Sequence, residues 1–404
     1  MSARVLVTDA ARGAAIAVIR SLGRRGFDVI AADSDSLSPG FYSKYVSVRL
    51  RYPPPRTDPD GAVAALLGAA RDHRVDLLVP ATEETVLLLS EARERFAGVT
   101  ALALPEREAY ARTRDKLATL ELAREAGVPV PETRLVTTAR EALAAAPALG
   151  WPVVVKPRRA SVVRGDGLVE HYEVSYAENA QELREQMQQL EGRSEVLLQE
   201  YYRGEGQGVE LLLRGGHPLA TFQHRRIREV PVTGGASSFR ESVPLDPVLN
   251  DYAVRLLAAL RWTGLAMVEF KLGALGPRLM EINGRIWGSL PLAVKSGMDF
   301  PARMADLYLG SPRSRNGPPD AEYALGVRSH NLDLEVIWIG SALRGRRGHR
   351  LVATPSRGDA LRVALSLVLP RDGFDVLTRD DPRPGLVELV RILRKLRRKV
   401  GLGH

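Results

Sequence analysis

The stretch Leu279–Leu290, LMEINGRIWGSL, decides the fold of this chain. An apolar run carries a carboxylate at Glu281, an amide at Asn283 and a guanidinium at Arg285, each two residues after the one before. If the first half of the stretch forms a strand, side chains at alternate positions point the same way. The stretch therefore predicts a strand that presents two oxygen ligands, and a cation behind them, to one site.

A second acidic stretch, AMVEFKL, comes just before the first and is joined to it by the short connection GALGP. This spacing predicts a β-hairpin in which Glu269 faces Glu281 and Asn283. Two buried glutamates repel each other and lose hydration, and a bound divalent cation removes that cost. Mg²⁺ takes oxygen ligands, keeps waters and bridges phosphates, so we expect Mg²⁺ here, with Mn²⁺ as an alternative. The other interpretation, that the glutamates are solvent-facing strand residues, stays open.

Composition bounds the class of protein. The 404 residues are 45% hydrophobic and 26% charged, which is typical of two or three packed domains. The absence of cysteine excludes disulfides, cysteine nucleophiles and thiolate metal sites, and the 7 histidines lack metal-ligand spacing such as HExxH. We expect no signal peptide, and no apolar run reaches the roughly 20 residues that span a bilayer. The expected location is cytoplasmic.

The net charge of +9 favours anionic partners, and much of the excess lies in the tail LVELVRILRKLRRKV, residues 386–400. Leucine and valine recur there at helical spacing while arginine and lysine fill the other positions, which predicts a basic amphipathic helix. The helix can pack on the body with a solvated basic face, or it can make peripheral contact with a membrane surface. A nucleic-acid partner is not expected, because aromatic residues are only 6% and are not interleaved with the basic ones.

The first hundred residues open like a parallel βαβ unit. Residues 3–35 read as a strand, a turn containing Gly13, a helix and a second strand. The turn lacks the three glycines of GxGxxG, so we expect no NAD. Further on, Thr82 and Glu83 follow the apolar strand VDLLVP, at the carboxyl end where parallel sheets bind ligands. They also have the residue types that cap a helix, and both interpretations stay open.

Two lysines and one loop are suited to phosphate. Lys156 ends the run VVV as a fixed point charge, and Lys116 opens a helix after Arg-Asp. In the loop of residues 158–167, RRASVVRGDG, two glycines let the backbone approach a polyphosphate. Each of these features alone is as typical of an ordinary protein surface.

An arginine-rich segment, TFQHRRIREVPVTGGASSFRESV, lies between these lysines and the acidic strands. Gly234 and Gly235 can present backbone N–H groups, and guanidinium groups suit carboxylate or phosphate. The arginines are Arg225, Arg226, Arg228 and Arg240. The segment predicts either a substrate-binding wall or a basic surface hairpin.

Taken in order, these parts resemble the ATP-grasp superfamily, in the branch of carbamoyl phosphate synthetase large chains, D-alanine ligases and related carboxylate-amine ligases. The motifs are RDK, VVVKP, the glycine-bearing loop, QEYY before RGEGQG, VEF and EINGR. The resemblance implies an α/β fold: a Rossmann-like pre-ATP-grasp domain at residues 1–110, then an ATP-grasp fold of two α+β subdomains at residues 111–315. Residues 316–404 are expected to form a C-terminal extension with the basic amphipathic helix.

The resemblance also implies roles within residues 151–205, the expected ATP lid and hinge. Lys116 and Lys156 would hold the ATP phosphates beneath a lid formed by residues 158–167. Glu200, with the backbone of Tyr201 and Tyr202, would recognise adenine in a slot between two sheets.

Further roles fall on the expected metal-binding strands, residues 264–290, and on the substrate walls. Glu269, Glu281 and Asn283 would hold Mg²⁺, while Arg285 and Lys156 would be catalytic and steady the transferred phosphoryl group. Glu205 is implied for the ribose, although it stands one position before the expected one. The residues implied for substrate are Thr82, Glu83, Arg225, Gly234 and Gly235.

The expected function is that of an ATP-dependent ligase. It would activate a carboxylate as an acyl phosphate and join it to an amine, releasing ADP and phosphate. There are two alternatives. The first is a carboxyphosphate-forming or kinase-like ATP-grasp enzyme, and the second is a non-catalytic ATP-binding module docked through the basic tail. The expected partners are ATP, a small carboxylate and a small amine that the sequence does not name, and a homo-oligomer is compatible with it.

Overall fold

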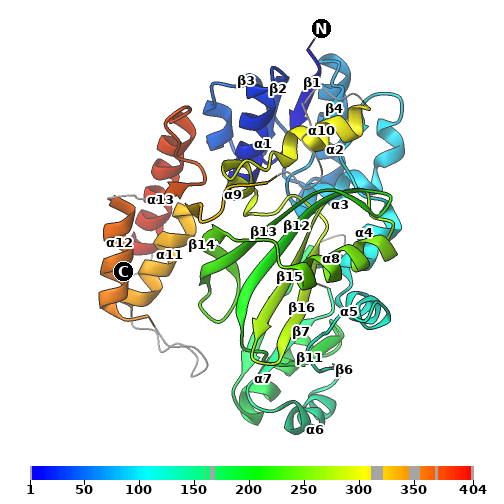
Figure 1. Ribbon diagram of the computed structural model, residues 1–404, viewed down its shortest axis with the longest axis vertical. Helices are drawn as coiled ribbons and strands as arrows, with labels where there is room; N and C mark the ends of the chain where they lie inside the picture. The colour runs from blue at the N-terminus through cyan, green and yellow to red at the C-terminus, as the bar shows by residue number, and fades with distance from the viewer. Residues whose placement is uncertain are drawn as a thin grey trace.

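The computed structural model describes residues 2–159, 161–163, 169–310, 322–344, 355–368 and 372–401, with side chains described except at 161–163, 169–171 and 398–401. Three larger sheets and one small pair of strands organise this part of the chain (Figure 1).

The N-terminal sheet is parallel throughout. Its strands are β1 (Arg4–Val7), β2 (Asp28–Asp33), β3 (Val46–Arg51), β4 (Leu77–Val79) and β5 (Ala101–Leu102), in the order β3-β2-β1-β4-β5. The connections contain α1 (Gly13–Arg24), η1 (Pro39–Tyr42), α2 (Pro59–Asp72), α3 (Glu83–Glu91) and η2 (Arg93–Phe96). The apolar residues of β1 and β4 are fully buried, as expected of strands covered on both faces. The predicted βαβ opening is confirmed.

The second sheet is antiparallel and has four strands. They are β6 (Thr133–Val136), β7 (Val153–Pro157), β10 (Ser175–Ala177) and β11 (Val196–Glu200), in the order β10-β7-β11-β6. The helices α4 (Arg107–Arg114) and α5 (Lys116–Glu125) precede it, while α6 (Ala139–Leu149) and α7 (Ala180–Leu190) pack on one face. A capping box between Thr138 and Glu141 begins α6, as its sequence dictates. The other face is left for the site.

The predicted ATP lid, residues 158–167, falls partly outside the described residues, because Ala160 and 164–168 are not among them. On either side, β8 (Ser161–Val163) and β9 (Val169–His171) pair antiparallel.

The third sheet has seven strands in the order β16-β15-β12-β13-β14-β17-β18. Its strands are β12 (Glu205–Arg214), β13 (His217–Val230), β14 (Ala236–Ser242), β15 (Gly264–Gly273), β16 (Gly276–Asn283), β17 (Arg328–His330) and β18 (Gly373–Phe374), and α8 (Pro247–Ala259), α9 (Leu290–Lys295) and α10 (Phe300–Leu309) connect or follow them. The hairpin predicted for the acidic stretches is confirmed, since β15 and β16 pair antiparallel with Glu269 opposite Glu281.

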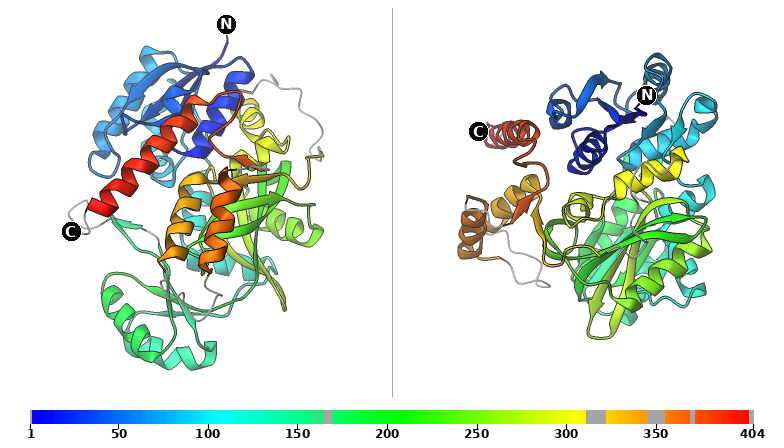
Figure 2. Two further views of the ribbon diagram at one scale, coloured as in Figure 1. Left: turned by 90° about the vertical axis from the view of Figure 1, so that its left-hand side faces the viewer. Right: turned by 45° about the horizontal axis from the view of Figure 1, so that its top comes forward.

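The helices α11 (Leu332–Leu343), α12 (Arg357–Val368) and α13 (Arg383–Gly401) form an outer layer on one side of the molecule (Figures 1 and 2). The sequence predicted an appended helical extension here, and the helices are present. It missed β17 and β18, which continue the seven-stranded sheet beyond β14. The segment after residue 321 is therefore part of the central sheet.

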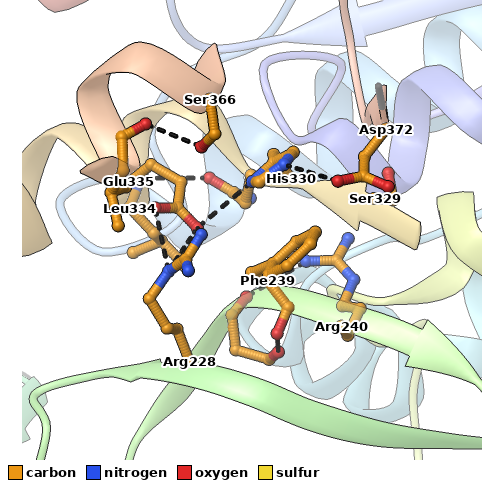
Figure 3. A network of polar contacts seen from close by, with 12 residues as sticks. Arg228, Phe239, Arg240, Ser329, His330, Leu334, Glu335, Ser366 and Asp372 are labelled. Carbon is orange, nitrogen blue, oxygen red and sulfur yellow. Dashed lines mark hydrogen bonds and ion pairs between the residues drawn. The ribbon is translucent and has the colours of Figure 1, made fainter. Parts of the chain in front are cut away.

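A network of polar contacts joins α11 to that sheet (Figure 3). Arg228 of β13 donates to Glu335 at 3.1 Å, and the Glu335 side chain is fully buried. The His330 ring stacks on Phe239 with centroids 3.9 Å apart, and its Nδ1 lies 3.4 Å from Glu335 Oε1. None of the helices in the described part of the chain combines the length and the apolar character needed to cross a membrane.

Candidate functional site

A cavity of about 380 Å³ lies between the four-stranded and seven-stranded sheets. A smaller cavity of about 90 Å³, bordered by α4 and α5, adjoins it. The walls common to both include Lys156, Glu281, Asn283 and Arg285, so the two cavities meet at these side chains. The slot between two sheets that the resemblance implied is present.

The two predicted lysines enter this site from different elements. On β7, Val153 and Val155 face the helices behind the sheet, so Lys156 faces the cavity. Asp115 caps α5 by accepting from the backbone N–H groups of Leu117 and Ala118, which fixes Lys116 at the first helical position. The Lys116 ammonium donates to the carbonyl of Pro157 at 3.0 Å.

Both lysines are easier to deprotonate than exposed ones. Burial lowers the pKa of Lys156 to about 8, with the carboxylate of Glu281 opposing and the charge of Lys116 adding to the effect. Burial also lowers the pKa of Lys116, against the carboxylates of Glu281 and Glu83. Two cations held side by side out of water are stabilised by an anion between them, and a polyphosphate has that charge.

The three predicted metal ligands meet one another. The amide nitrogen of Asn283 donates to Glu269 Oε1 at 3.0 Å and to Glu281 Oε1 at 2.8 Å. Arg226 of β13 lies 2.5 Å from Glu269 Oε2 and neutralises that carboxylate. Burial raises the pKa of Glu269, and its neighbour Glu281 raises it further. For Glu281, burial is outweighed by the Asn283 hydrogen bond and the nearby cations, which lower its pKa.

This donor set fits a cation that shares its shell with other ligands. The described residues contain no group of three or more His, Cys, Asp or Glu side chains arranged to hold a metal. Here two carboxylates and an amide converge, and turning the amide exchanges its nitrogen for its oxygen. Mg²⁺ binds proteins through one or two carboxylates and completes its shell with water and phosphate oxygens, so the residues fit Mg²⁺ bound together with a nucleotide.

The opposite end of the larger cavity carries the predicted hinge. Its lining includes Glu200, Tyr201 and Tyr202, with apolar walls of Val154, Phe270 and Met280. The Glu200 carboxylate accepts from the backbone N–H of Glu132 at 3.0 Å, which joins β11 to the start of β6. Tyr201 meets the Tyr176 ring edge-on, with centroids 5.7 Å apart.

Lys271 is a cavity residue that the sequence analysis missed. Its ammonium lies 5.2 Å from the centre of the Tyr201 ring, and burial lowers its pKa. The signal was available, because Lys271 stands two residues after Glu269 on the same strand and therefore on the same face.

Two predicted residues are not brought to the cavity. Glu205 is exposed and accepts from Gln207 Nε2 at 2.8 Å, and Arg225 lies 2.6 Å from Glu241. The alternation along each strand explains both positions. Gly206 on β12 and Arg226 on β13 line the cavity, so Glu205 and Arg225, one position earlier, face the other side of the sheet.

The glycines of RGEGQG make room beneath the cavity. A Cβ on Gly208 would lie 2.4 Å from Cε1 of His224, and a Cβ on Gly206 would lie 2.9 Å from Cδ of Arg226. Real side chains do not approach that closely, so only glycine lets His224 and Arg226 lie across β12.

A buried acid–histidine pair borders the larger cavity and was also missed. His224 lines the cavity, and its Nδ1 lies 3.0 Å from Oε1 of the fully buried Glu210. Ser289, just after the GRIWG run, donates to the same oxygen at 2.7 Å. Within the described residues, Oε2 of Glu210 has no hydrogen-bond partner. Burial lowers the pKa of His224, and Glu210 opposes that effect.

Four of the residues predicted for substrate line three different cavities. Gly234 and Gly235 line the main cavity, and Gly234 has a φ of +127°, where a side chain is strained. Glu83 lines the smaller cavity and pairs with Arg114 at 3.3 Å. Thr82 instead caps α3 through Thr85 and lines a separate cavity of about 280 Å³.

Comparison with known proteins bears on the fold and the family. A family model described as "ATP-grasp in the biosynthetic pathway with Ter operon" matches residues 193–331. The carbamoyl phosphate synthase large chain of Thermus thermophilus is 28% identical over 225 residues, which cover 53% of this chain and 21% of that protein. The match therefore spans only a minor part of the curated relative.

Solved structures with low identity share the fold. Carboxyaminoimidazole ribonucleotide synthase from Aspergillus clavatus, complexed with ATP, gives a TM-score of 0.64 at 17% identity and covers 91% of this chain and 97% of that chain. The L-amino acid ligase from Bacillus licheniformis gives 0.58 at 17% identity, with coverage of 78% and 77%. The fold, the ATP-grasp family model that matches residues 193–331 and the match to carbamoyl phosphate synthase all support the resemblance to the ATP-grasp superfamily, which includes the carboxylate-amine ligases.

Proposed function

We propose that this protein is an ATP-dependent ligase that activates a small carboxylate as an acyl phosphate and joins it to an amine, with release of ADP and phosphate. One observation carries the proposal. Lys116 and Lys156, held by α5 and the four-stranded sheet, converge on the same space as Glu281 and Asn283 of the seven-stranded sheet. A protein that only binds a nucleotide has no evident need for all of these groups around one point.

The roles of the residues follow from their places. The apolar slot beside Tyr201 and Tyr202 takes the adenine, and Lys116 and Lys156 hold the phosphates. Glu269, Glu281 and Asn283 would hold Mg²⁺, which when bound neutralises phosphate charge and fixes the orientation of the triphosphate. Because the cations are in place before the reaction, little reorganisation is needed as charge develops.

The transfer itself needs no enzyme nucleophile, which suits a chain without cysteine. The substrate carboxylate attacks the γ-phosphorus, ADP leaves, and an acyl phosphate forms. Arg285, at the junction of the two cavities, would neutralise the transferring group. The amine then attacks the carbonyl carbon, phosphate leaves and the ammonium proton is lost. His224, which lines the same cavity and whose pKa is lowered by burial, would accept that proton in its neutral form.

The test is ADP release with Mg²⁺ across pools of amino acids and small carboxylates, with and without amines, and mass detection of products. The ligase proposal expects ADP only when both substrates are present, with a new mass equal to their sum less water. ADP release that needs bicarbonate alone would indicate the carboxyphosphate-forming alternative. ATP binding without turnover in any pool would contradict the ligase.

A matched pair of variants ties the result to the site. Glu281→Gln removes a carboxylate from the metal set, and we expect turnover to fall about a hundredfold or more, as for loss of one transition-state charge partner. Glu191→Gln makes the same chemical change at an exposed position and should leave turnover unchanged. Equal activity of both variants would remove the metal assignment.

A further inference from the structure

The C-terminal helix α13 is attached to the body through one face only. Ile392 is 5% exposed and packs inward. Arg391 pairs with Asp35 of the N-terminal domain at 2.9 Å, and Lys395 pairs with Asp333 at the start of α11 at 2.5 Å. The packing of the tail on the body, one of the two interpretations of its sequence, is therefore present.

The apolar stripe of that helix is nevertheless on the outside. Its members are exposed by 55% at Leu386, 37% at Leu389, 42% at Val390, 57% at Leu393 and 41% at Leu396. They recur every three or four residues, so they form one continuous stripe along the helix. The sequence analysis expected a solvated basic face; the structure shows that the leucines, too, face outward and that charged residues make part of the inner contact.

Basic residues border this stripe. Arg394 and Arg397 are exposed. Arg394, one residue after Leu393, lies at the edge of the stripe, and Arg397, four residues after Leu393, lies on the same face as the stripe. From Leu389 to Val400 the sequence has no acidic residue, and Glu388 lies half-buried on the inner side. The exposed face is thus apolar in the middle and cationic at its edge.

The helix α12 lies on the same side of the molecule as α13 (Figure 2). It carries a second exposed apolar stripe. Leu361, Leu365 and Val368 recur at helical spacing and are 62%, 54% and 75% exposed. Scattered apolar side chains are normal on a protein surface, but two stripes on neighbouring outer helices are not.

We infer that α13 docks the protein on an anionic lipid surface, with the leucine stripe in the headgroup region and the arginines against lipid phosphates. An amphipathic helix with a cationic border has the composition of helices that lie in the plane of a membrane. Anionic headgroups complement its charge. A second copy of the chain fits less well, because pairing two α13 faces would bring their arginines together.

The experiment is co-sedimentation of the full chain with vesicles, with thermal unfolding as the fold control. Binding is expected to vesicles containing about 30% phosphatidylserine, and not to pure phosphatidylcholine, since the attraction depends on anionic lipid. It should be lost at about 1 M salt, where charges are screened within a few ångströms. The inference would be overturned if the protein sediments equally with both kinds of vesicle, or if it sediments with neither.

Matched variants separate the helix from the general charge of the protein. Leu389→Ser with Leu393→Ser, and separately Arg394→Glu with Arg397→Glu, should each weaken vesicle binding about tenfold or more. The controls are Leu275→Ser, at a 77% exposed turn, and Arg140→Glu with Arg184→Glu, which make the same charge change on the exposed surfaces of α6 and α7. Both controls should bind like the parent.

Measuring the oligomeric state tests the alternative that a second copy of the chain covers the leucine stripe. If the parent chain is a dimer, ignores vesicles and becomes a monomer on Leu389→Ser with Leu393→Ser, the stripe is a contact between copies and the lipid inference is wrong. A monomeric parent that binds vesicles supports it. These outcomes do not depend on turnover, so the proposed ligase activity and the docking can fail separately.

Discussion

At the scale of single residues, the site works through buried charges that the protein alone does not balance fully. Lys116, Lys156 and Lys271 all have pKa values lowered by burial, while burial raises that of Glu269. The magnesium nucleotide proposed as ligand would supply the missing charge of both signs. These residues were largely predictable, because a lysine at a strand end and glutamates on alternate strand positions have few other uses in apolar surroundings.

The lowered pKa of Lys156 predicts a pH dependence of ATP binding. The charge of Lys156, proposed to hold phosphate, is present below pH 8 and is lost as pH rises through about 8 in the free protein. ATP affinity should therefore be flat below that pH and fall by up to about tenfold per unit above it. Calorimetry in two buffers checks this, since binding near pH 9 should take up a proton.

The matched variant for that profile is Lys156→Arg, which keeps its charge at every accessible pH. It should bind ATP with a flat profile even if more weakly, whereas Lys44→Arg, at an exposed lysine, should keep the parent's slope. A slope that survives in Lys156→Arg would assign the titration to another group.

His224 gives a second prediction at this scale. We expect His224→Asn to lower kcat about a hundredfold or more with little change in KM for ATP, as for loss of a general base. The acid limb of the pH–rate profile should disappear with it. His217→Asn, at an exposed position on the same strand, is the control. A rise in KM for ATP with kcat unchanged would indicate that His224 only lines the cavity and is not the general base.

At the scale of elements, the residues that reach the site are those whose side chains point to the cavity face of each strand. The acidic hairpin was predictable because two alternating stretches are joined by a short turn. The side of β12 and β13 that faces the cavity was not predictable, because the sequence of a strand shows which residues alternate but not which of its two faces packs against the site. Arg225 was therefore chosen where Arg226 lines the cavity.

The close approach of His224 to Gly208 of β12 predicts that a larger residue at this position disturbs the cavity. Gly208→Ala places a Cβ against the His224 ring and the sulfur of Met267, both at the cavity wall. We expect turnover to fall at least about tenfold, because a displacement near 1 Å is enough to disturb a catalytic arrangement. Steady-state kinetics and thermal unfolding together measure it.

The control for this change is Gly68→Ala in the middle of α2, where nothing lies within 4 Å of the added Cβ. In a helix this substitution should leave turnover unchanged and add about 0.5–1 kcal/mol to the free energy of unfolding. Full activity in Gly208→Ala would show that His224 can move without consequence.

At the scale of the whole molecule, the segment after residue 321 joins the parts together. Arg240 of β14 pairs with Asp375, both 1% exposed, and Arg20 of α1 pairs with Asp381 at 2.9 Å. Its last helix, α13, could be predicted from the helical spacing of its leucines and valines. Its strands could not, because β17 and β18 have three and two residues and take their structure from the edge of β14.

The buried pair predicts a large loss of stability. Asp375→Ala leaves Arg240 buried without its carboxylate, and we expect the free energy of unfolding to fall by about 3–5 kcal/mol. Asp380→Ala breaks the exposed pair with Arg24 and should cost less than about 1 kcal/mol. Denaturant midpoints compare the two, and equal losses would contradict the role of the buried pair.

The late position of β17 in the sequence has a consequence for synthesis. The edge of β14 is complete about 85 residues before its neighbour emerges, given strands that end at Ser242 and begin at Arg328. Throughout that interval the nascent chain presents an unpaired edge, the feature that templates misassociation. Slow translation through residues 243–327 should therefore lower the yield of native protein without altering the final product.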